Sequence, residues 1–178
     1  SGSNTGGGGG SCGSEGGGSL GTSPDGFVFP LRTTKATLQR GYNGQRWCYQ
    51  SQTNCHHHYN AADIIINTGT PVVAVRNGTI TNTRSDPARL VLHADNGRSY
   101  YYTHMLDGSL TVRDGQEVRA GQQLGVVGDD ADGEGIRHLH IDELPRPPYD
   151  YRPSCGNAAC QAFPFINIQP ELLAAYAN

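Results

Sequence analysis

After about residue 24, the chain is built from short runs in which apolar residues alternate with polar ones, a pattern that favours half-buried β-strands. The clearest runs lie within residues 70–83, 88–105, 116–128 and 137–144. Asn77-Gly78 and Asp95-Asn96-Gly97 interrupt the first two segments and predict hairpin turns. Ala120-Gly121 predicts a further turn before a short apolar strand.

Short strand-like runs, together with ten prolines and many glycines in the chain, predict an all-β domain with an antiparallel sheet or sandwich. The one helical segment that we expect is short and covers residues 170–178, with Pro170 at its start. Residues 1–23 hold 11 of the 25 glycines, which predicts a flexible tail or linker. Residues 24–178 are then expected to form the domain.

Charge and cysteine usage narrow the class of protein. A net charge of −3 gives no electrostatic support for nucleic-acid binding, and no apolar run approaches the roughly 18 residues that span a bilayer. Cys48 and Cys55 lie close together in the sequence, as do Cys155 and Cys160. Short spacings favour local disulfides, and therefore an exported protein. A four-cysteine zinc site is the alternative, but the spacing of Cys48 and Cys55 is wider than that of a usual zinc knuckle. Cys12 is left over in the tail.

The histidines provide the candidate chemistry. Seven are present, at positions 56, 57, 58, 93, 104, 138 and 140. His138 and His140 stand one residue apart in a strand-like run, so their side chains would lie on one face of the strand. Two imidazoles and one carboxylate are a usual ligand set for a catalytic zinc, and Asp63 follows the His56–His58 triplet. The remaining histidines could then transfer protons.

Several segments, taken in order, resemble the lysostaphin/LytM-type zinc metallopeptidases, which are peptidoglycan endopeptidases with a groove in a β-sheet. They are "HHHYNAADI", "GTPVVAVRNGTI", "YYTHM", "GQQLGVVG" and "HLHIDE". The resemblance covers roughly residues 55–144, about half of the chain. It implies an antiparallel sheet or sandwich of the duplicated hybrid motif type and one bound Zn²⁺.

The resemblance also implies site residues. Asp63 and His140 resemble the second and third zinc ligands of the family. In the family the first ligand is usually a histidine four residues before the aspartate, but Tyr59 stands there, so the loop is interpreted as two residues longer. His57 is then the first ligand, with His56 and His58 as alternatives. His104 and His138 resemble the two catalytic histidines that bind no metal.

Four other features receive weaker interpretations. Tyr59 and Tyr102 are candidates for lining the substrate groove. His93 has no counterpart in the family and is interpreted as structural. Glu143 could hold a histidine tautomer, but three residues past His140 it would face the opposite side of the strand. The acidic run at residues 129–134 lacks the spacing of an EF-hand and is expected to be a solvated loop.

The resemblance implies a zinc endopeptidase that hydrolyses stems or cross-bridges of bacterial peptidoglycan. One alternative is a protease that acts on Gly-rich proteins, and another is a silent or autoinhibited member that binds cell wall or regulates another hydrolase. A secreted β-domain that stores metal is disfavoured, because storage needs neither His104 nor His138. We expect a monomer that is secreted, periplasmic or attached to the cell envelope, with any anchor upstream of Ser1.

Overall fold

The computed structural model describes residues 20–38, 42, 44, 46–47, 60–129, 136–145 and 165–178. The Gly-rich tail as far as residue 19, the His56–His58 triplet, Tyr59 and all five cysteines lie outside these ranges. The tail, disulfide and first-ligand interpretations therefore stay predictions.

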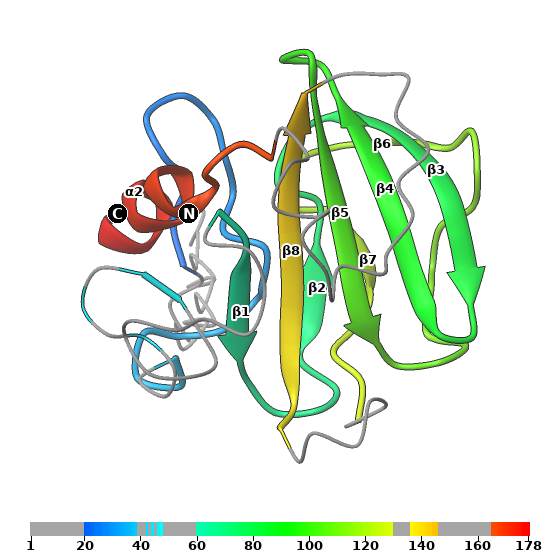
Figure 1. Ribbon diagram of the computed structural model, residues 1–178, viewed down its shortest axis with the longest axis horizontal. Coiled ribbons are helices and arrows are strands. Elements are labelled where there is room, and N and C mark those ends of the chain that lie inside the picture. Colours follow the sequence, from blue (N-terminus) through cyan, green and yellow to red (C-terminus); the bar gives the residue numbers. More distant parts are fainter. Residues whose placement is uncertain are drawn as a thin grey trace, which may run out of the picture.

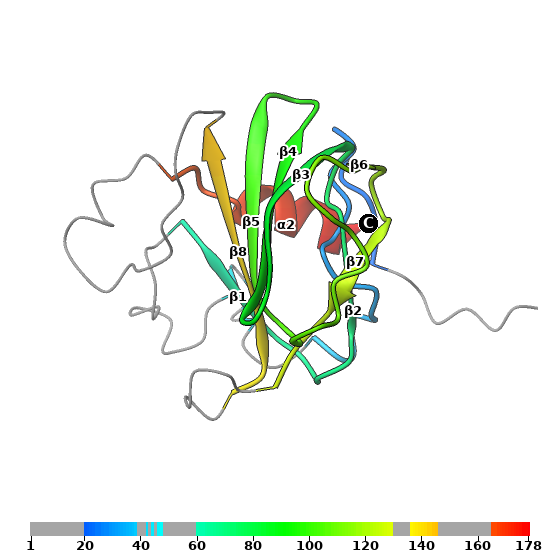
Figure 2. The same cartoon turned by 90° about the vertical axis from the view of Figure 1, so that its right-hand side faces the viewer.

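Two antiparallel sheets pack face to face (Figures 1 and 2). Within the described residues, the larger sheet has six strands in the order β1-β8-β5-β4-β3-β6 and the smaller one pairs β2 with β7. The strands of the larger sheet are β1 (Ala62–Ile65), β3 (Gly78–Ser85), β4 (Ala88–Ala94), β5 (Arg98–Met105), β6 (Glu117–Val118) and β8 (His138–Pro145). Those of the smaller sheet are β2 (Pro71–Val73) and β7 (Gln123–Val126), and helix α2 spans Gln169–Ala177. The predicted all-β architecture is confirmed.

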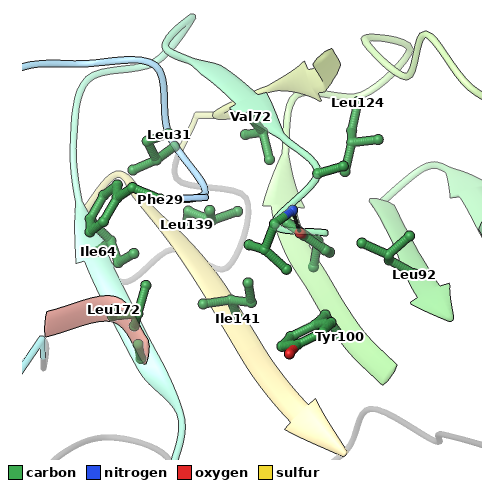
Figure 3. Packing of buried hydrophobic residues seen from close by; sticks show 14 of the residues in the cluster. Phe29, Leu31, Ile64, Val72, Leu92, Tyr100, Leu124, Leu139, Ile141 and Leu172 are labelled. Carbon is green, nitrogen blue, oxygen red and sulfur yellow. Dashed lines mark hydrogen bonds between the residues drawn. The ribbon is translucent and has the colours of Figure 1, made fainter. Parts of the chain in front are cut away.

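The hydrophobic core lies between the two sheets and against α2 (Figure 3). Every second residue of a strand points into this core. Leu139 and Ile141 of β8 are fully buried there, as is Leu92 of β4. Val72 and Leu124 enter from the smaller sheet. Because one face of β8 is committed to this core, the alternate residues of β8 are presented on the opposite face of the larger sheet.

The turn predictions have mixed outcomes. The hairpin across Asp95-Asn96-Gly97 is confirmed, since β4 pairs with β5, and the helix near Pro170 is confirmed as α2. The hairpin predicted at Asn77-Gly78 is wrong, because β2 pairs with β7 whereas β3 pairs with β4 and β6. Gly78 serves close packing here, because a Cβ on it would lie 2.2 Å from the carbonyl oxygen of His93.

Tyr102 does not line a groove, and this expectation from sequence is corrected by the structure. The side chain is fully buried in the core, and its hydroxyl accepts a hydrogen bond of 3.0 Å from the backbone N–H of Val75. Its neighbour Tyr101 pairs with Asp142 across the strands and therefore lies on the face away from this core. A run of three tyrosines does not reveal which of them faces inward.

We expect Tyr102→Phe to lower the free energy of unfolding by about 1–3 kcal/mol, because the buried N–H of Val75 loses its acceptor. Chemical denaturation followed by tryptophan fluorescence measures this. Tyr176→Phe, at a half-buried position on α2, is the matched control and should cost less because its side chain is more accessible to water. Equal losses for the two variants would contradict the buried hydrogen bond.

A charged cluster joins α2 to the sheet at the end of the core. Arg76 bonds the carboxylates of Asp25 and Glu171, and the hydroxyl of Tyr100 donates to Glu171 over 3.1 Å. Glu143 pairs with Tyr100 across the strands and is 4% exposed. Burial, followed by the nearby Glu171 carboxylate, raises the pKa of Glu143 to about 8.

This raised pKa predicts how stability depends on pH. The native protein keeps a proton on Glu143 that the unfolded chain releases near pH 4.5, so its contribution to the free energy of unfolding falls between about pH 5 and pH 8. Glu143→Gln removes this contribution. The free energy of unfolding of the wild type minus that of the variant, measured by urea denaturation, should decline as pH rises through that window. Glu117→Gln, at an exposed position on β6, is the control, and a parallel decline in it would refute the assignment to Glu143.

Candidate active site

Strands β8 and β1 position three of the predicted site residues. His138 and His140 are 5% and 4% exposed and lie on the face of β8 opposite the core. In the antiparallel register, Asp63 of β1 stands directly across from His140, and its side chain is 3% exposed. Directly paired residues of adjacent strands share a face, so the register brings this carboxylate to both histidines.

His140 lies between two buried carboxylates. Its Nδ1 is 2.8 Å from Oδ1 of Asp63, and its Nε2 is 3.0 Å from Oδ2 of Asp142. Burial disfavours the charged ring, but Asp142 and Asp63 outweigh this effect and raise the pKa of His140 to about 10. With no cation bound, the imidazolium itself supplies the positive charge between the two carboxylates.

His138 has a tautomer that the backbone determines. Its Nδ1 is 3.0 Å from the carbonyl oxygen of Ile136, and since a carbonyl only accepts hydrogen bonds, the proton must be on Nδ1. In the neutral form of the ring Nε2 then carries the lone pair, and this atom is 3.8 Å from Oδ1 of Asp63. The ring is thus oriented with its basic nitrogen toward the site.

His104 reaches the same face through an irregularity in β5. Thr103 pairs with His140, so regular alternation would point His104 toward the core. Instead its φ is 63°, and its ring centroid lies 4.4 Å from that of His138. Three residue steps of β5, from Tyr102 to Met105, face two steps of β4, which is a β-bulge. The extra residue turns the His104 side chain to the site.

The donor atoms fit a metal ion but do not complete its coordination. Asp63 Oδ1 and His140 Nδ1 converge in a buried position, and an oxygen and a nitrogen so placed suit a divalent cation. Among the described residues, no group of three or more His, Cys, Asp or Glu side chains is arranged to hold a metal. A metal held here would need a further ligand, and the predicted His57 lies outside the described residues.

Sequence reasoning missed one residue on this face, Asp142. Asp142 is 1% exposed and contacts His140. Tyr101, which the sequence left open between a strand former and a groove residue, packs with Val91 and Leu144 in a small apolar cluster. The signal for Asp142 was available, since it lies two residues after His140 and alternation places it on the same face. Glu143, considered from sequence instead, lies on the core side as its parity predicts, 3.8 Å from Arg98.

The other weakly interpreted residues lie outside this cluster. His93 bonds the hydroxyls of Thr81 and Ser99 at 2.8 and 2.7 Å, in agreement with a structural role. It also lines a polar hollow at the opposite end of the strands, together with Asp95 and Glu117. The rest of the acidic run after Asp129 lies outside the described residues.

Comparison with solved structures gives matches to bacterial peptidases. Lysostaphin from Staphylococcus simulans is 21% identical with a TM-score of 0.52, covering 76% of this chain and 50% of that one. Its catalytic domain is 22% identical with a TM-score of 0.49, covering 65% and 79%. A zinc-containing peptidase from Vibrio cholerae is 25% identical with a TM-score of 0.50, covering 71% and 38%. The chain thus spans half or less of the full-length lysostaphin and Vibrio chains.

Similarity to known families gives the assignment. No curated protein matches the chain, and no helix among the described residues is long and apolar enough to cross a membrane. The model of peptidase family M23 matches residues 57–145, which is half of the chain and includes Asp63, His104, His138 and His140. The chain belongs to peptidase family M23.

Proposed function

We propose that the chain is a zinc-dependent endopeptidase that hydrolyses peptide bonds in the stems or cross-bridges of bacterial peptidoglycan. The observation that carries this proposal is the convergence of Asp63, His104, His138 and His140 on one face of the sheet. Membership of family M23 and the zinc-containing Vibrio relative support it. As part of the same proposal, the protein is exported to the cell envelope and acts as a monomer.

Zinc would be held by Asp63, His140 and a histidine of the 56–58 triplet, for which His57 is our choice. When bound, zinc polarises a peptide carbonyl and acidifies water. The two carboxylates already present around His140 favour a cation at this position. The protein contributes the orientation of the donors, which the β1–β8 register fixes before metal binding.

The two remaining histidines divide the proton transfers. His138 presents Nε2 with its lone pair toward the site, so we assign it as the general base that takes a proton from the attacking water. His104, whose ring lies 4.4 Å from that of His138, is assigned to donate an N–H to the oxyanion and to pass on to the leaving amine the proton that His138 has taken. The bulge in β5 is what brings this second group within reach.

Zinc content tests the ligand set. We expect the purified protein to hold about one Zn²⁺ per chain, as catalytic sites with three protein ligands do. His57→Ala should lose most of it, because two ligands bind zinc more weakly than three. Mass spectrometry of metals in the dialysed protein gives the result, with His56→Ala and His58→Ala as matched controls. Retention of zinc by His57→Ala and its loss in one control would move the ligand to that position.

Cleavage of purified peptidoglycan tests the activity. Mass spectrometry of the released fragments should reveal new amine and carboxyl ends that disappear with a zinc chelator. We expect His138→Ala to lower the rate by about 10²–10⁴-fold, the usual contribution of a general base. His93→Gln, outside the site, should leave the rate unchanged.

Two results would redirect the proposal. Cleavage of Gly-rich proteins in preference to peptidoglycan would favour the secreted-protease alternative. Absence of all cleavage by protein that holds zinc would favour a silent or autoinhibited family member.

A further inference from the structure

The Asp142 carboxylate is buried at a position where burial costs stability. The residue is 1% exposed, and removing a carboxylate from water costs several kcal/mol unless it is paired and hydrogen-bonded. Its strand neighbour in the register is Tyr101, which belongs to the small apolar cluster. An apolar residue would pack at this position at lower cost, so the carboxylate points to a role beyond packing.

Geometry links this carboxylate to one nitrogen of His140. Oδ2 of Asp142 lies 3.0 Å from Nε2, whereas Oδ1 of Asp63 lies 2.8 Å from Nδ1 on the other side of the ring. A neutral imidazole has a single N–H, and an ionised carboxylate only accepts hydrogen bonds. When Asp142 accepts the proton of Nε2, Nδ1 is left with its lone pair directed at Asp63.

We propose that Asp142 is a positioning residue that accepts the Nε2 proton of His140 and so keeps Nδ1 unprotonated and aligned with Asp63 as the zinc-binding nitrogen. This inference rests on the proposed function, because it presumes that Asp63 and His140 bind zinc. It also explains the alternation His138, His140, Asp142 along β8, which places the proton acceptor and both histidines on one face. Partners of this kind fix ring orientation and ligand basicity.

Asp142→Asn is the decisive variant, because it keeps the shape of the side chain but can donate from its amide. An amide that donates to Nε2 stabilises the tautomer with the proton on Nδ1, where it competes with the metal. We expect its affinity for Zn²⁺, measured by competition with a chromophoric chelator, to fall by about 10–100-fold. Glu143→Gln is the matched control. It removes the adjacent buried carboxylate on the other face, so zinc affinity should stay within about twofold.

A spectroscopic measurement on the wild type does not depend on whether the variant folds. With ¹⁵N-labelled histidine and bound zinc, long-range ¹H–¹⁵N spectra should assign the N–H of His140 to Nε2, with a proton shifted far downfield by the carboxylate. In Asp142→Asn that proton should move upfield. A merely structural role for Asp142 would change the unfolding midpoint without changing this signal in the folded protein.

The outcomes separate this inference from the proposed function. Wild-type protein that takes up no zinc would overturn the proposed function, and this inference with it. Wild-type protein that binds zinc, with Asp142→Asn binding equally well, would overturn the role of Asp142 alone. An N–H on Nδ1 of His140 in the zinc-loaded wild type would do the same, even if the variant could not be obtained folded.

Discussion

Strand β8 has two buried faces, and the rest of the structure depends on this constraint. It is hydrogen-bonded to β1 on one side and to β5 on the other, so its register aligns three strands at once. Leu139 and Ile141 fill the core while His138 and His140 lie on the opposite face. A slip of one residue would exchange these two sets, placing imidazoles in the core. The hydrophobic core therefore fixes the geometry of the polar site.

The bulge in β5 is the one departure from regular pairing that the site requires. Regular alternation would place Thr103 on the site face and His104 in the core, but the left-handed backbone at His104 reverses its direction. Such a conformation is unfavourable for a residue other than glycine and persists only where its surroundings hold it. The backbone N–H of Gly128 donates to the carbonyl of His104 over 2.9 Å, and a Cβ on Gly128 would lie 2.8 Å from Met105. A glycine at 128 lets β5 and the segment after β7 approach closely at this point.

How much of the fold and site could be predicted from the sequence depends on the alternation of side chains between the two faces of each strand. The pattern H-x-H was enough to place His138 and His140 on one face, and the same rule would have placed Asp142 there. Alternation did not decide the tyrosine run, because adjacent aromatic residues suit either face; Tyr100 and Tyr102 proved to lie in the core and Tyr101 on the opposite face. It would also have failed for His104, since one extra residue in β5 leaves no mark in the sequence. The resemblance to a known family supplied His104 where local rules could not.

The turn at Asn77-Gly78 illustrates a different limit. Its residues fit a hairpin, but the flanking runs belong to different sheets, and glycine is needed there for contact with the β4 backbone. Local signals specify where the chain can approach itself closely, not which strand it meets, because pairing is decided by burial over the whole sheet.

The electrostatics of the site connect its stability to its chemistry. Asp63 and Asp142 place two carboxylates within hydrogen-bonding distance of one buried ring, the imidazolium of His140. A divalent cation on the Asp63 side would displace the Nδ1 proton and take over its role, while Asp142 would keep the proton on Nε2. Metal binding would then release a proton and couple to folding, because the unfolded chain has no such arrangement of donors. Burying two carboxylates costs stability, and the core on the other face of β8 offsets this cost. The buried carboxylates would in turn prepare the site for a divalent cation.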